Sequence, residues 1–192
     1  MKTLNEFINE ALNISSMKPR NKEELQKLVE NLIKKRGYEA DLNDIDTSNV
    51  KDMSFLFEDS KFNGNISKWD VSNVENMKGM FMDSKFDGDI SGWDVSNVIY
   101  MDGMFSRSEF NQDISEWDVS NVAHMSNMFY GSKFNGDLSW WDVSSVQDMR
   151  NMFKDSKFNR NISKWNVRAI EYMHGMFDNC PITDAHKPKF KK

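Results

Sequence analysis

The amino-acid sequence predicts an α/β repeat solenoid, in which six units of 24 residues stack on one another. Three observations predict it: a tryptophan, a phenylalanine and a methionine each return at intervals of 24 residues. A unit of this length cannot bury its own apolar side chains, so neighbouring units must stack to form a continuous core. Strands about 4.8 Å apart would then form a parallel sheet, and six units would give a core roughly 25–30 Å long.

Several columns of identical residues carry the repeat. The tryptophans are Trp69, Trp93, Trp117, Trp141 and Trp165. The first phenylalanine column is Phe57, Phe81, Phe105, Phe129, Phe153 and Phe177, and the second is Phe62, Phe86, Phe110, Phe134 and Phe158. The methionines are Met53, Met77, Met101, Met125, Met149 and Met173. We expect each column to form a ladder through the interior.

Within one unit, the apolar spacing predicts a short strand followed by one or two helical turns. Trp69 and Val71 alternate with polar neighbours, which is the period of a strand with one buried face. Val74, Met77 and Phe81 then recur at spacings of three and four, which is the period of a helix. Asn-Gly and Asp-Gly pairs predict the left-handed turn positions that lead to the next strand. These pairs are Asn63-Gly64, Asp87-Gly88 and Asn135-Gly136.

The repeated unit W-D-V-S-N-V-x-x-M-x-x-M-F-x-x-S-x-F-N resembles the BspA-like leucine-rich-repeat surface-protein family. The resemblance covers about residues 46–182. It implies a solenoid of leucine-rich-repeat type and a role in binding or adhesion, and it brings no catalytic residues. Such repeats occur in bacteria, including mycoplasma lipoproteins, and in some phage proteins. Many relatives carry a secretion or lipidation signal, whereas the N-terminus here has no apolar signal region. We therefore expect a cytoplasmic protein, or one of the virion or host cytoplasm if a phage encodes it.

The flanking segments divide the rest of the chain into three parts. Residues 1–16 predict an amphipathic helix, which would either pack on the core or serve as an interaction peptide. Residues 17–45 predict a helical cap, because Asn21 and Glu24 form a capping box and Gly37 can end the helix. Residues 46–182 hold the six repeats, and residues 183–192 form a basic tail that we expect to be disordered.

Positions that break the repeat on exposed surfaces are the candidates for partner contact. Trp140 stands where other units have lysine, glycine or glutamate, and an exposed tryptophan is a typical hot spot of an interface. Tyr100 and His124 share a second variable column, and Tyr130 adds to that surface. Isolated exposed apolar side chains are also normal in proteins that bind nothing there.

An aspartate column is the most regular polar feature, and Asp94 and Asp118 are candidate contact residues within it. Residues 46–182 hold 21 acidic against 13 basic residues, a net charge of −8. Three interpretations remain open for this column: turns in which each carboxylate accepts nearby backbone N–H groups, a ladder of bound cations, or an acidic face for a basic partner.

Catalytic, metal and cofactor sites are not expected. Cys180 continues a column of small serines, and the three histidines have no metal-ligand spacing. No phosphate-binding loop or catalytic triad pattern occurs, and no apolar run reaches the roughly 20 residues that span a bilayer. The chain has a net charge of −5, and it therefore lacks the excess of basic residues that is typical of a nucleic-acid-binding protein.

The sequence therefore predicts a non-enzymatic module that binds a protein partner. It does not predict the oligomeric state. A structural or adhesion component of a virion or cell surface is the main alternative. An inhibitor that mimics an acidic ligand is another.

Overall fold

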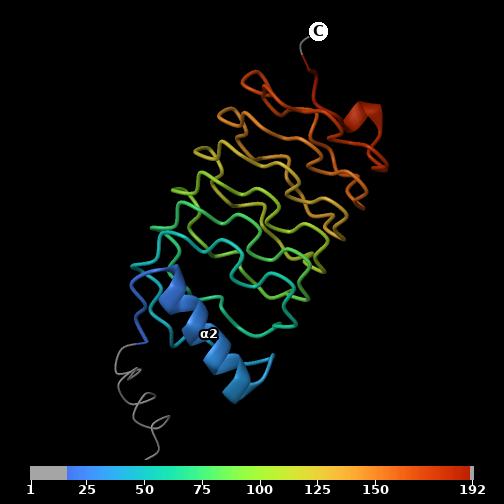
Figure 1. The fold of residues 1–192 in the computed structure, drawn as a ribbon. Coiled ribbons are helices and arrows are strands. Elements are labelled where there is room, and N and C mark those ends of the chain that lie inside the picture. The colour runs from blue at the N-terminus through green and yellow to red at the C-terminus, as the bar shows by residue number, and fades with distance from the viewer. Residues whose placement is uncertain (1–16, 191–192) are drawn as a thin grey trace, which may run out of the picture.

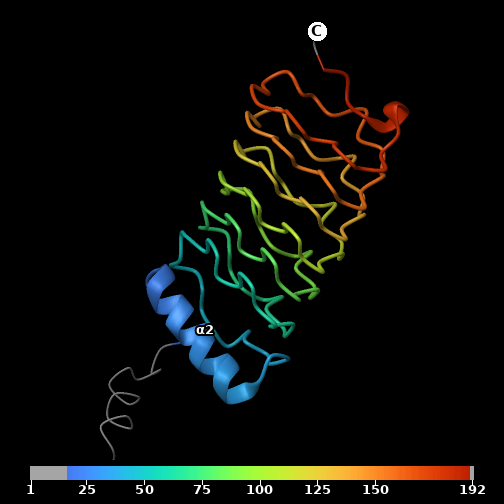
Figure 2. The same ribbon diagram turned by 45° about the vertical axis from the view of Figure 1, so that its right-hand side comes forward.

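The computed structural model describes residues 17–190, which form one N-terminal helix followed by a stack of irregular rungs. Helix α2 (Lys22–Arg36) lies across the N-terminal end of the stack, and a 3₁₀ helix (Asp184–His186) lies at the other end (Figure 1). The rungs repeat the same path at each level when the molecule is turned (Figure 2). The amphipathic helix expected over residues 1–16 lies outside the described residues.

Helix α2 confirms the helix that the sequence predicts. The side chain of Asn21 accepts a hydrogen bond from the Glu24 N–H at 3.0 Å, and Gly37 ends the helix. The Glu24 carboxylate accepts the N–H of Arg20 at 2.9 Å, one residue before the predicted partner of the capping box. Leu25, Val29 and Leu32 are buried among the apolar residues of the core. The helix thus covers the apolar N-terminal end of the stack.

The predicted parallel sheet is wrong. The described residues contain no strand, and the parallel pairing between neighbouring rungs is limited to isolated bridges. The leucine-rich-repeat solenoid, with its sheet and short helical turns, is therefore not the fold of this chain. In place of the strand, the N–H of Trp93 bonds to the Ile90 carbonyl at 3.1 Å, and that of Val98 bonds to Val95 at 2.9 Å, so this segment is a pair of tight turns.

The segment expected to be helical is also a series of turns, in which alternate N–H groups have different partners. One set crosses to the next rung over 2.8–2.9 Å: Met77, Gly79, Phe81 and Asp83 donate to the carbonyls of Tyr100, Asp102, Met104 and Ser106. The other set folds back by three residues within the rung: Met80, Met82 and Ser84 donate to Met77, Gly79 and Phe81. The intervening N–H groups fold back within the rung and do not bond to the other neighbouring rung, so neither a helix nor a continuous sheet forms.

Two left-handed residues in most rungs explain this path, since positive φ interrupts both helical and extended backbone. The first column is Phe55, Gly79, Gly103, Asn127, Asn151 and Gly175, and the second is Asp59, Asp83, Arg107, Gly131, Asp155 and Asn179. The glycines of the predicted Asn-Gly and Asp-Gly turns are not among them, so that expectation is wrong. Asn and Asp tolerate this conformation better than most residues, which accounts for much of both columns.

The predicted ladders of apolar side chains are confirmed except at the last rung, where Met173 is exposed. Phe81 and Phe105 stack with ring centroids 5.7 Å apart and an interplanar angle of 4°, and Phe105 stacks on Phe110 at 4.2 Å. Every tryptophan of the column donates its indole N–H to a carbonyl in the preceding rung; for Trp117 the acceptor is Ile90, at 3.2 Å. Each indole N–H thereby gains a hydrogen-bond partner inside the core, on a carbonyl that already accepts a backbone N–H within its own rung.

The C-terminal tail is ordered up to residue 190, contrary to expectation. Pro188 is buried, and the ring of Phe190 packs against Phe177 with centroids 6.5 Å apart. Across residues 17–190, no helix is long and apolar enough to cross a membrane.

Replacing Phe105 by alanine should lower the free energy of unfolding by about 3–5 kcal/mol, because a fully buried ring would leave a cavity between two stacked neighbours. Tyr38→Ala is the control, since this side chain is 51% exposed and should change stability by less than about 0.5 kcal/mol. Urea denaturation followed by tryptophan fluorescence measures both. Similar losses in the two variants would contradict the stacked core.

Gly103 tests the left-handed backbone separately from packing. Its φ is +62°, and an added Cβ would meet nothing closer than 4.0 Å. Gly103→Ala should therefore cost about 1 kcal/mol from the backbone alone. Gly103→Asn should cost less, because Asn127 already has this conformation in the same column. Equal stability of the wild type and the alanine variant would count against a positive φ at this position.

Candidate interaction surfaces

One column of bridge residues changes its side chain from rung to rung. It consists of Asp52, Asn76, Tyr100, His124, Asp148 and Tyr172, and each residue forms a parallel bridge with the next. The bridges align successive residues at about the spacing of neighbouring strands, roughly 4.8 Å. Buried methionines such as Met101 and Met125 directly follow in the chain, so the column borders the core. Variable side chains are thus held in register on a rigid backbone.

Tyr100 and His124, which the sequence places in one column, lie in contact. Their rings stack with centroids 5.1 Å apart and an interplanar angle of 15°. Tyr100 is nevertheless 43% exposed, so the pair presents an aromatic surface to solvent. Tyr172, three rungs after Tyr100, is 52% exposed.

Asp148 and Arg150 form an ion pair between these aromatic residues. The Arg150 Nε lies 2.9 and 3.0 Å from the two carboxylate oxygens, and its guanidinium carbon lies 5.4 Å from the centroid of the Tyr172 ring. Burial by itself would raise the pKa of the Asp148 carboxyl, but the hydrogen bonds from Arg150 hold that pKa below its usual value. Arg150 is therefore held in place by a carboxylate on one side and a tyrosine ring on another.

Asp102 completes this cluster, which is the place among residues 17–190 where three potential metal ligands converge. Ligand atoms of Asp102, His124 and Asp148 all lie within 4.8 Å of one another. The Ser126 hydroxyl donates to Asp102 at 2.6 Å, while Asp148 accepts from both the backbone and the side chain of Arg150. A metal ion would have to compete with Arg150 for the oxygens of Asp148, so the geometry fits an ion-pair network better than a metal cage.

We call the shallow groove formed by these side chains the Tyr100–Tyr172 face. Its main lining residues are Asn76, Tyr100, Asp102, His124, Asp148, Arg150 and Tyr172. Sequence reasoning did not select Asp102 or Arg150. The signal for both was present, because they share a second variable column with Lys78, Ser126 and His174.

Asp94 and Asp118 are exposed, and each is engaged in a local turn. Asp94 accepts the N–H of Ser96 at 3.1 Å and its hydroxyl at 2.6 Å, and Asp118 accepts the same groups of Ser120 at 3.0 and 2.6 Å. The Ser120 hydroxyl lowers the pKa of Asp118, with help from the Ser120 N–H. The turn interpretation of this column is thus confirmed, and a partner contact at these two residues stays a prediction.

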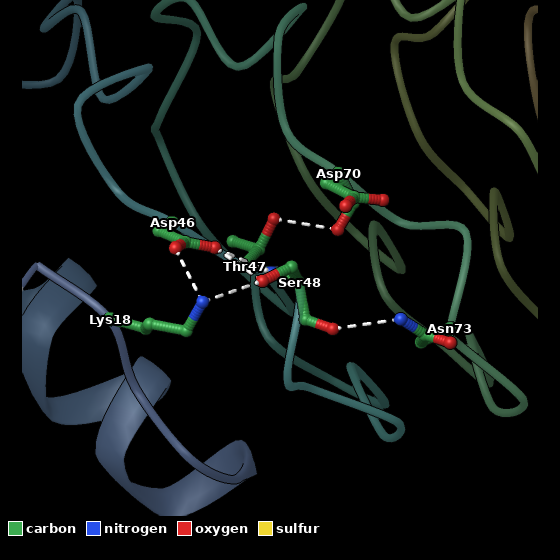
Figure 3. Close-up of polar contacts among 6 residues, drawn as sticks. All are labelled: Lys18, Asp46, Thr47, Ser48, Asp70 and Asn73. Carbon is green, nitrogen blue, oxygen red and sulfur yellow. Dashed lines mark hydrogen bonds and ion pairs between the residues drawn. The ribbon is translucent and has the colours of Figure 1, made fainter.

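The same turn at the first rung ties the segment that precedes helix α2 to the stack (Figure 3). Asp46 accepts bonds from the Ser48 hydroxyl and from Lys18, whose ammonium lies 2.7 Å away. The Thr47 hydroxyl donates to the Asp70 carbonyl at 2.8 Å, and the Asn73 amide donates to the Ser48 carbonyl at 2.9 Å. Side chains therefore connect successive rungs here, while the Asp46 N–H bonds back to the Met17 carbonyl.

Trp140 lies in a separate groove. It is 80% exposed beside the buried Trp141, and the ammonium of Lys164 lies 6.0 Å from the centroid of its ring. Asp137, Arg160 and His186 also line this groove. Tyr130 is half-buried and lines neither groove, so the structure does not group it with Tyr100 or with Trp140.

Comparison with known proteins places the chain in a family. A family described as "Mycoplasma protein of unknown function, DUF285" matches residues 23–132 and 106–190, which together span most of the chain. The chain belongs to this family. The expected membership of a mycoplasma-type repeat family is thereby confirmed, without the leucine-rich-repeat fold attached to it. No curated protein and no solved structure matches the chain.

The ion pair at the first rung gives a prediction about pH. Lys18 and then Ser48 lower the pKa of Asp46 to about 2. Because the folded-state pKa lies below the value of about 3.9 in unfolded chains, this contribution to stability is present above pH 4 and is lost as pH falls toward 2.

Titration of the Asp46 carboxyl by NMR should show this low pKa in the wild type and a higher one in Lys18→Met. Lys18→Arg should retain the low value, since it keeps the charge. An unchanged pKa in Lys18→Met would show that the lysine is not the cause.

Proposed function

We propose that this chain is a non-enzymatic protein-interaction module that binds a partner through the Tyr100–Tyr172 face. The observation that carries the proposal is the gathering of aromatic and charged side chains at the one bridge column that varies. Tyrosine and arginine are enriched at the energetic centres of protein interfaces. Their positions are pre-organised here, because the bridges hold the backbone and Arg150 is already paired with Asp148. Pre-organised side chains lose little entropy on binding.

Charge supports a basic region on the partner. The repeats carry the net acidic charge of the chain, and Asp102 accepts the Ser126 hydroxyl while forming no ion pair among the described residues. Tyr100 and Asp102 would offer a cationic side chain of a partner an aromatic ring beside a carboxylate. The same two kinds of group, from Tyr172 and Asp148, already hold Arg150. Acidic surroundings would also steer such a partner toward the face at low salt.

The alternative is a structural or adhesion role, in which the stack is a spacer. The regular rungs favour it, since stacked repeats give a stiff rod without any binding face. A second form of the binding proposal, in which the chain inhibits a partner by mimicking an acidic ligand, is supported only by the net acidic charge of the repeats.

The double variant Tyr100→Ala/Tyr172→Ala should weaken binding of a captured partner by at least about tenfold, because two exposed rings of the face are lost. Affinity capture from a bacterial lysate at two salt concentrations, followed by titration of the captured protein, measures this. Tyr38→Ala is the matched control, since it removes an equally exposed tyrosine from another part of the chain.

Equal binding by all three proteins would contradict the face. If no protein is captured and removal of residues 1–16 changes the oligomer size in light scattering, the assembly role would replace the proposal.

A further inference from the structure

The groove around Trp140 has a charge opposite to that of the rest of the stack. Arg160 and Lys164 supply two cations against the single carboxylate of Asp137, and His186 lies at the same groove. In the repeats as a whole, acidic residues outnumber basic ones by eight. A cationic groove is therefore a local exception, and it lies beside Trp140, the exposed tryptophan, with both cations on the following rung.

The polar groups of this groove leave donors free while most acceptors are engaged. Asp137 accepts the N–H of Ser139 at 2.9 Å, and Asn161 accepts that of Ser163 at 3.0 Å. Arg160 uses its Nε for the Asn135 carbonyl at 2.8 Å, which positions the guanidinium and leaves its two terminal nitrogens available.

The two cations are not used in ion pairs. Within residues 17–190, no carboxylate lies at ion-pair distance from Arg160 or Lys164. The ammonium of Lys164 instead lies over the Trp140 ring, which weakly attracts a cation without neutralising it. A ligand that supplies carboxylates would therefore gain two charge-assisted interactions, one of them with a guanidinium fork.

The Trp140 ring supplies the apolar part of the site. It is 80% exposed, and a flat indole offers a large contact area with few rotatable bonds to order. The combination selects a ligand with an apolar or aromatic side chain next to carboxylates.

We propose that the Trp140 groove binds an acidic peptide segment of a partner, which places an apolar or aromatic side chain on Trp140 and carboxylates on Arg160 and Lys164. A peptide fits better than a nucleic acid, although both could stack on a tryptophan. A nucleic acid carries a charge at every phosphate and would be repelled by the acidic columns on either side. A peptide can confine its negative charge to the groove.

This inference stands apart from the proposed Tyr100–Tyr172 face, because the two grooves share no lining residue. Substitutions in one groove leave the other groove intact, so either proposal can be contradicted without affecting the other.

Selection from a phage-displayed library of random peptides tests the proposal on the full chain. The selected peptides should be net acidic and should contain an aromatic or large aliphatic residue. Their synthetic forms should lose at least about tenfold in affinity with Trp140→Ala, and also with Arg160→Gln/Lys164→Gln, since 1.4 kcal/mol corresponds to tenfold. Binding should weaken with salt for the wild type and much less for the double variant.

The substitutions are chosen to preserve the fold. Gln112 already occupies the column position of Arg160 two rungs earlier, and position 164 is an exposed lysine whose column also holds Gly92 and Glu116. Lys68→Gln is the control, because it removes a lysine from the same column at a rung without an exposed tryptophan. Circular dichroism establishes that each variant is folded.

Several results would overturn the proposal. These are the absence of any enriched peptide, enrichment of neutral or basic peptides, or an equal loss of affinity with Lys68→Gln. Competition by single-stranded oligothymidylate at a similar concentration would indicate a nucleic-acid site instead. A concentration-dependent dimer that Trp140→Ala abolishes would show that a second copy of the chain occupies the groove.

Discussion

The backbone hydrogen bond from one rung to the carbonyl 23 residues further along the chain is the constraint on which the rest of the molecule depends. It keeps the path of every rung in the same register, so that phenylalanine meets phenylalanine and tryptophan follows tryptophan. A slip of one residue would exchange the inward methionines with the polar residues beside them. The aromatic stacks and the indole N–H bonds then reinforce the same register from within the core.

The register also determines the surface. Every outward position becomes a column, and a column of identical aspartates is satisfied locally by the serines two residues on. Recognition can then be built only where a column varies. The Tyr100–Tyr172 face and the Trp140 groove are two such places, and they differ in charge. A single acidic stack can thus carry surfaces of different chemistry at its variable positions.

Parts of the fold and of the candidate site could be predicted because their signals are local or strictly periodic. Helix α2 is encoded by Asn21 and by the apolar stripe that follows it, within a few turns of chain. The contact between Tyr100 and His124 follows from their separation by one period. The pairing of Asp148 with Arg150 was missed because both are common surface residues, and only the burial of Asp148 and the position of Arg150 over the Tyr172 ring distinguish them.

Periodicity and residue type therefore determined which side chains are buried, since burial depends on apolar character at a fixed spacing. Only the tertiary structure decided how the backbone travels between those side chains. The period of two around Trp93 is equally compatible with a strand and with a tight turn. Asp83 and Arg107 have positive φ although neither is a glycine, so residue type did not predict the left-handed backbone there. The partners of their N–H groups lie a full rung away, so no local pattern could show that the rungs would be joined by single bridges and not by a sheet.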